Sequence, residues 1–193
     1  MTALTWAAYE NGTLPPDNIY CQTRDVAQAR VEAVKLELAK NGWSQSDAAL
    51  ITAILGELTS NAFDHNLGQW SDVPGCWLET GVDQHLFTAV IADRGQGVRS
   101  SLERVRPGID DQEALNIAFT QRVTGRAPEQ RGNGLKFVLN ALNEFPTAQF
   151  DFQSGEAHLS YKGQHNPADA TFHIVDGQSP VRGVVTSLRL QRL

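Results

Sequence analysis

The chain has 193 residues, of which 41% are hydrophobic and 20% are charged, and its formal net charge is −6. These values are typical of a single soluble globular domain, residues 1–193, with a substantial core. The acidic balance argues against nucleic acid as the main partner, because phosphate binding needs a basic surface, and no apolar stretch is long enough to span a membrane.

The N-terminal region carries few signals. Residues 1–11 lack a basic leader and a continuous apolar stretch, so we expect no signal peptide and a cytoplasmic protein. Residues 14–21 contain Pro15 and Pro16 and predict a loop followed by a short edge strand. The two cysteines, Cys21 and Cys76, make no disulfide framework, which favours a reducing compartment.

The first long helix is predicted over residues 24–40, with Thr23 as its N-cap and Asn41-Gly42 at its end. Residues 44–47, Ser-Gln-Ser-Asp, resemble a capping box that starts a second helix. Because a short turn joins the two helices, we expect them to pack antiparallel. The apolar stripe of the first helix consists of Ala27, Val31, Val34 and Leu38.

The second helix, with its exit at residues 48–66, carries a polar edge beside its apolar stripe. Glu57, Asn61 and His65 recur every four residues and therefore line up on one side of the helix, with Asp64 beside them. A carboxylate, a carboxamide and an imidazole beside a buried face indicate a site set against the interior. A solvated helix edge with a capping histidine is the alternative. The apolar stripe is Ile51, Ile54, Leu55, Leu58 and Ala62.

Two strands are predicted at residues 76–82 and 85–92, and the second runs directly into Asp93-Arg-Gly-Gln-Gly97. A carboxylate at the end of a buried strand can accept a hydrogen bond from an exocyclic amine. Gly95 and Gly97 let the backbone turn and approach a ligand closely. An ordinary strand-to-loop turn would use the same residue types.

Residues 99–131 form a long polar connection with a predicted helix at 110–123, an arrangement typical of a lid. The connection ends in Arg131-Gly-Asn-Gly-Leu135, which leads into a predicted helix at 136–143. Glycines at a helix N-terminus leave amide N–H groups accessible, and these groups attract phosphate. A glycine-rich N-cap without a ligand is the alternative.

The C-terminal part is predicted to be mostly strand. A hairpin is expected from strands at 147–153 and 157–161 about Ser154-Gly155, then a short strand at 171–175 and a final strand at 183–192. A Walker P-loop, a complete GxGxxG motif, the kinase signatures and a His-Glu-x-x-His zinc helix are all absent from the sequence.

The three motifs ELTSNAFDH, DRGQG and RGNGL, in this order, resemble the N box and the two glycine boxes of the GHKL ATP-binding fold. The pattern Glu57-Leu-x-x-Asn61-Ala-x-x-His65 is most similar to the bacterial anti-sigma-factor serine kinases. The resemblance covers about residues 23–190. It implies an α/β (α+β) fold: a two-layer Bergerat-type sandwich whose mixed, mostly antiparallel sheet carries helices on one face.

The resemblance also implies ATP or ADP and Mg²⁺ as ligands. Asn61 would coordinate Mg²⁺, Asp93 would hold the adenine amine, and Glu57 would be the catalytic general base. The other nucleotide-binding residues that it implies are Asp64, His65, Gly95, Gly97, Arg131, Gly132, Asn133, Gly134, Leu135 and Thr186.

The implied function is a serine kinase or anti-sigma-like switch that acts on a small regulatory protein, either anti-anti-sigma-like or sigma-factor-like. A nucleotide-gated binding module with little turnover and a detached histidine-kinase-like catalytic domain stay open, as does a homodimer. Three departures from the family pattern matter. The second glycine box has Asn133 and Lys136 where smaller or apolar residues are more common. The final strand begins Gly183-Val184 in place of Gly-Thr, where Thr186 substitutes in part, and residues 155–182 add β structure of unknown purpose.

Overall fold

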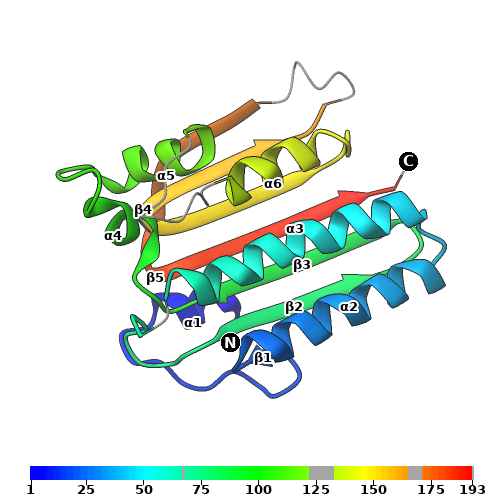
Figure 1. Cartoon of the computed structure of the whole chain (residues 1–193), viewed down its shortest axis with the longest axis horizontal. Coiled ribbons are helices and arrows are strands. Elements are labelled where there is room, and N and C mark those ends of the chain that lie inside the picture. The colour runs from blue at the N-terminus through cyan, green and yellow to red at the C-terminus, as the bar shows by residue number, and fades with distance from the viewer. Residues whose placement is uncertain (67, 122–132, 165–170, 193) are drawn as a thin grey trace.

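A five-stranded sheet forms the centre of the molecule (Figure 1). The structure is a computed structural model and describes residues 1–66, 68–121, 133–164 and 171–192. The sheet order is β1-β2-β3-β5-β4, and every pairing among these strands is antiparallel. The strands are β1 (Tyr20–Cys21), β2 (Cys76–Val82), β3 (Leu86–Asp93), β4 (Gln149–Lys162) and β5 (Thr171–Gln191).

Helices α2, α3 and α6 cover one face of this sheet (Figure 1), which confirms the predicted two-layer α+β sandwich. The larger core cluster lies between the two layers and takes in residues of α5 as well. The helices are α1 (Ala3–Ala8), α2 (Arg24–Lys40), α3 (Gln45–Asp64), α4 (Gly97–Glu103), α5 (Asp111–Thr120) and α6 (Gly134–Leu142).

The two long helices form as their sequence signals predict. Thr23 caps α2 by accepting a hydrogen bond from the Val26 N–H, and Ser44 caps α3 by accepting one from the Asp47 N–H. The predicted apolar stripes of both helices are buried. Helix α3 ends at Asp64, with His65 as its C-cap, so the predicted exit at residues 65–66 lies just beyond the helix.

The predicted hairpin about Ser154-Gly155 is wrong. Strand β4 continues through both residues, and its burial alternates along most of its length, as a single pleated strand requires. Gly155 has a φ of +59° and lies at a bulge in the β4–β5 pairing. The two predicted strands at 171–175 and 183–192 belong to one strand, β5. Residues 155–162 and 171–182 therefore extend β4 and β5 beyond the rest of the sheet.

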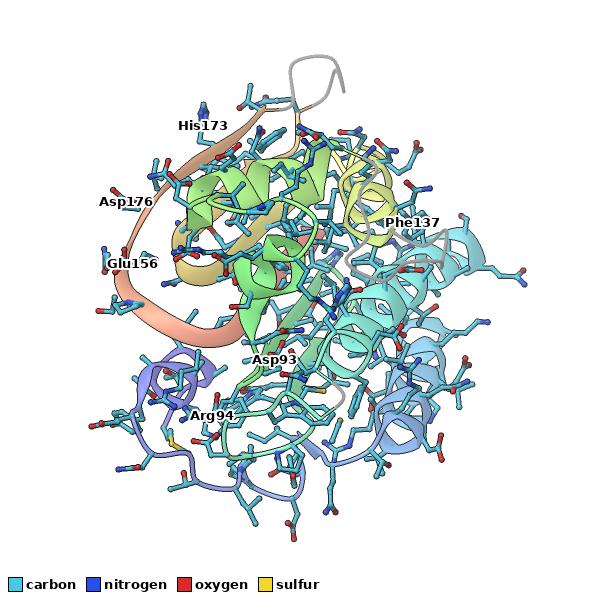
Figure 2. All side chains as sticks on the ribbon, turned by 60° about the vertical axis from the view of Figure 1, so that its left-hand side comes forward. Asp93, Arg94, Phe137, Glu156, His173 and Asp176 are labelled. Atoms are coloured by element: carbon cyan, nitrogen blue, oxygen red, sulfur yellow. The ribbon has the colours of Figure 1, made fainter. Side chains whose placement is uncertain are left out.

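This extension packs against the connection between β3 and α6. The Asp111 carboxylate at the start of α5 accepts a hydrogen bond from the Glu156 N–H, and Gln112 donates one to Asp176. Figure 2 shows Glu156, Asp176 and His173 along the outer edge of the extension.

The predicted helix at 110–123 is α5, capped by Asp110, whereas the polar stretch before it contains the unpredicted helix α4. The last part of the predicted lid, residues 122–131, lies outside the described residues.

Helix α1 lies on the opposite face of the sheet from α2, α3 and α6, where it packs with β3 and β5 in a second, smaller core. The fully buried Arg94 side chain holds this segment. It donates to the carbonyl oxygens of Trp6 and Tyr9 and forms a bidentate ion pair with Asp72, with N–O distances of 2.8 and 2.7 Å. The N-terminal segment is thus held by hydrogen bonds from Arg94, the residue that follows Asp93.

Candidate nucleotide site

A cavity of about 570 Å³ lies between α3, α6 and the adjoining ends of β3 and β5. Its volume is inside the range of about 300–1,000 Å³ that small-molecule sites occupy. The structure brings most of the predicted site residues to its walls: Glu57, Asn61, Asp64, His65, Asp93, Gly97, Asn133, Gly134, Leu135 and Thr186. Arg131 and Gly132 lie outside the described residues, and Gly95 lies just behind the wall.

Asp93 lies at the floor of the cavity, at the C-terminal end of β3, and is 4% exposed. Its Oδ1 accepts hydrogen bonds from the Gly95 N–H at 2.9 Å and from the Asn66 amide at 2.8 Å. Burial raises the pKa of this carboxyl to about 7, although these two donors and the Val184 N–H act in the opposite direction. A buried carboxyl that titrates near neutrality in a cleft is a candidate for ligand recognition.

Asn66 is a buried site residue that the sequence analysis did not assign to the site. Its side-chain amide donates to the Ala62 carbonyl and to Asp93, and its Oδ1 accepts from the Gln96 N–H at 3.1 Å. It therefore ties the end of α3 to the glycine motif after β3. In the sequence, Asn66 stands one residue after His65 and is off the four-residue repeat of Glu57, Asn61 and His65. Helical periodicity therefore could not reveal its contacts with Asp93 and Gln96.

Gly95 has a different role from the predicted ligand wall. A Cβ at this position would lie 1.9–2.2 Å from the side-chain atoms of Asn66, so only glycine fits beside that amide. Gly97, by contrast, lines the cavity and has a φ of +75°. The two glycines of the motif thus serve different purposes: the first accommodates Asn66, and the second turns the chain into α4.

The polar edge of α3 faces the N-terminus of α6. A Cβ on Gly134 would lie 2.5 Å from Glu57 Oε2 and 3.9 Å from Asn61 Nδ2, so Gly134 lets the backbone of α6 approach both side chains. The Asn133 side chain makes no capping hydrogen bond to the helix. The first N–H groups of a helix carry a partial positive charge, and here they lie beside a carboxylate and a carboxamide at the cavity wall.

Asp64 and His65 lie at the far end of the same edge. Asp64 forms an ion pair with Arg24 of α2, and the His65 carbonyl accepts a hydrogen bond from the Gln96 side chain. Both residues and Arg24 line the cavity. Arg24 is a wall residue that the motifs did not indicate, because it comes from a different helix.

Thr186 lies on β5 beside the floor and is 2% exposed. It is paired with Ile91, two residues before Asp93, and it shares a sheet face with Val184, the partner of Asp93. Apolar side chains complete the walls: Leu58, Ile91, Val98, Leu102, Ala118, Phe137 and Phe152. Figure 2 shows Phe137 on α6, away from Asp93. The cavity therefore combines an apolar slot with a buried carboxyl at one end and a helix N-terminus at the other.

Among the described residues, no group of three or more His, Cys, Asp or Glu side chains is placed to hold a metal ion. The polar atoms present do fit Mg²⁺, which takes oxygen ligands, keeps several waters and is often bound through one or two protein groups together with phosphates. Glu57 places a carboxylate oxygen next to the helix N-terminus, and Asn61, one turn further along α3, carries a carboxamide oxygen at the same cavity wall. No described helix is long and apolar enough to cross a membrane.

No protein-family model and no curated protein matches this sequence. Among solved structures, the B subunit of the DNA gyrase from Myxococcus xanthus is similar over 84% of this chain and 42% of that chain, with 15% sequence identity and a TM-score of 0.37. This chain thus spans less than half the length of that subunit.

Proposed function

We propose that the cavity binds ATP or ADP together with Mg²⁺, and that the chain is a nucleotide-dependent regulatory protein. The observation that carries this proposal is Asp93: a buried carboxyl, held by Asn66 and Gly95, at the floor of an apolar slot. An adenine ring fits such a slot because its faces are apolar and its exocyclic amine can donate to the carboxylate.

The phosphates would extend from this floor toward Asn61 and the N-terminus of α6. That end offers N–H donors beside Glu57 and Asn61, and Gly134 adds no side chain of its own there. Asn61 would supply a carboxamide oxygen to Mg²⁺, and the ion would neutralise phosphate charge when bound. Asp64 would act through its ion pair with Arg24, by holding the end of α3 in place.

We further propose that the chain transfers the γ-phosphoryl group to a serine hydroxyl of a small regulatory protein. The motif resemblance suggests this acceptor, and the position of Glu57 supports a transfer step. Its carboxylate lies on the same edge of α3 as Asn61, one turn earlier, beside the α6 N-terminus. From there it can accept a proton from an attacking hydroxyl.

Calorimetry with ATP and ADP, with and without Mg²⁺, tests the binding proposal. We expect Mg²⁺-dependent ATP binding, and we expect Asp93→Asn to weaken adenine nucleotides by about 1–3 kcal/mol, the cost of an unmatched buried polar group. Asp151→Asn, on β4 and outside the cavity wall, is the matched control and should bind as the wild type does. Absence of binding to folded protein at millimolar nucleotide would refute the proposed function.

Binding of the adenine part should depend on pH through Asp93. Its pKa of about 7 means that the carboxyl carries a proton below neutrality, and this proton must leave before an amine can donate to a carboxylate. Because each pH unit below the pKa costs about a factor of ten, we expect adenosine to bind about tenfold more tightly at pH 8 than at pH 6. Adenosine is the preferred probe because it has no phosphate that titrates in this range.

Asp93→Asn is the control for this measurement, since the variant should show no such dependence. His65 also lines the cavity, and histidine is the side-chain type that most often changes charge between pH 5 and 8. A pH dependence that persists unchanged in Asp93→Asn would come from a group other than Asp93 and contradict the role given to Asp93.

A further inference from the structure

Two buried thiols lie opposite each other at the edge of the sheet, on the two strands that precede the Asp93 strand in the sheet order. Cys21 of β1 and Cys76 of β2 are direct partners in the antiparallel pairing, and both are free cysteines with no exposed surface. Each thiol shifts the pKa of the other, downward for Cys21 and upward for Cys76. Directly opposite residues in such a pair have Cα atoms about 4.5–5.5 Å apart, inside the roughly 4.4–6.8 Å that a disulfide spans.

The two thiols are chemically unequal. The neighbouring Cys76 thiol lowers the pKa of the Cys21 thiol, and the positive charge of Arg30 on α2 acts in the same direction. The Cys21 thiol, together with burial, raises the pKa of Cys76. A thiolate is the species that attacks a disulfide, so Cys21 is the nucleophile of the pair and Cys76 the resolving thiol.

Access to the pair runs through β1, which is a two-residue edge strand. Arg30 holds the loop before it by donating to the carbonyl oxygens of Asp17 and Asn18. Short edge elements with few ladder hydrogen bonds open locally at a lower free energy than central strands do. Local opening of β1 therefore exposes Cys21 without unfolding the sheet.

Cross-strand pairing connects the thiols to the proposed adenine site. Cys76 is paired with Asp93 across β2 and β3, so Cys21, Cys76 and Asp93 occupy consecutive strands. Gly75 keeps the backbones close there, since a Cβ on it would lie 2.2 Å from the Cys21 carbonyl oxygen. A disulfide would change the side-chain conformation of Cys76, the strand partner of Asp93, and through this pairing it would act on the contacts of Asp93 with Asn66 and Gly95.

We propose that Cys21 and Cys76 form a redox-active dithiol, which a low-molecular-weight disulfide oxidises to an intramolecular disulfide that weakens nucleotide binding at Asp93. The second half of this inference rests on the proposed function. The Cys21 thiolate attacks one sulfur of the oxidant and releases one thiol. The Cys76 sulfur then loses its proton, attacks the Cys21 sulfur and releases the second thiol. The protein loses two electrons and two protons, and the oxidant gains them.

The test equilibrates the full chain in buffers of reduced and oxidised glutathione. Mass spectrometry after acid quenching should show a species that lacks two hydrogen atoms, with Cys21 and Cys76 in one cross-linked peptide. Cys21→Ala and Cys76→Ala should each give no such species. Calorimetry with ADP should show binding about tenfold weaker for the oxidised wild type, within the 5–150-fold range of ordinary coupling between sites. Reduction should restore it.

The outcomes separate the two halves of the inference. Two glutathione adducts, or unmodified thiols at full oxidation, would overturn the dithiol assignment. A complete intramolecular disulfide with unchanged ADP affinity would overturn the link to Asp93. If the reduced wild type binds no ADP, the proposed function and the link both fail, while the mass spectra still decide whether the disulfide forms. If an alanine variant does not fold, the cross-linked peptide of the wild type decides in its place.

Discussion

Replacing Glu57 by alanine is expected to lower phosphoryl transfer about 100-fold or more while ATP affinity stays nearly unchanged, because a general base contributes to the transition state and need not touch the nucleotide. Glu57 lies beside Gly134 at the N-terminus of α6, where the phosphates are proposed to bind. Radiolabelled phosphate transfer to protein or water, with calorimetry on the same sample, measures the two quantities separately.

Two further variants make this result interpretable. Glu57→Gln keeps the size and hydrogen-bonding capacity of the side chain but cannot take a proton, so it should fail in the same way. Asn61→Ala, one turn further along α3, should lose Mg²⁺-dependent affinity and turnover together, because its oxygen is proposed to hold the ion. Wild-type transfer by Glu57→Ala would defeat the catalytic role. Tight ATP binding by the wild type without transfer to any acceptor would favour the nucleotide-gated binding module.

The parts of the fold that local sequence determines were predictable. Thr23 and Ser44 are helix caps because their hydroxyls accept hydrogen bonds from N–H groups three residues later, which is a short-range arrangement. The buried stripe of α3 follows from helical periodicity alone. The polar edge with Glu57 and Asn61 was visible for the same reason, and the structure places that edge at the cavity wall.

The remaining features depend on contacts between distant residues. Gly155 was interpreted as a turn because glycine is common in turns, but Asp111 of α5 fills the space beside it and β4 continues through a bulge. Arg94 was predicted only as part of a glycine motif, whereas its side chain is buried among carbonyl groups more than eighty residues earlier in the chain. The role of Asn66 was also not predictable, because its hydrogen-bond partners Asp93 and Gln96 come from a different part of the chain. Neither contact leaves a periodic signal.

Gly95→Ala is expected to reduce the free energy of unfolding by about 1–3 kcal/mol, the usual cost of overpacking, and to abolish adenosine binding. The added Cβ would lie within 2.2 Å of the Asn66 side chain. Asn66 must move, and Asp93 then loses the amide that holds its Oδ1. Gly95 is not among the glycines with positive φ, so alanine can adopt its backbone conformation and the cost is steric. Urea unfolding and calorimetry measure the two effects.

Gly56→Ala provides the matched control, since it makes the same chemical change within α3, where the new Cβ would meet no atom within 4 Å beyond the adjacent helix backbone. Alanine loses less backbone entropy than glycine in a helix, so this variant should raise the free energy of unfolding by about 0.5–1 kcal/mol and leave adenosine affinity unchanged. The two substitutions should therefore have opposite signs. If Gly95→Ala is as stable as the wild type and binds adenosine normally, the contact between Gly95 and Asn66 does not position Asp93, and the proposed floor of the adenine site is wrong.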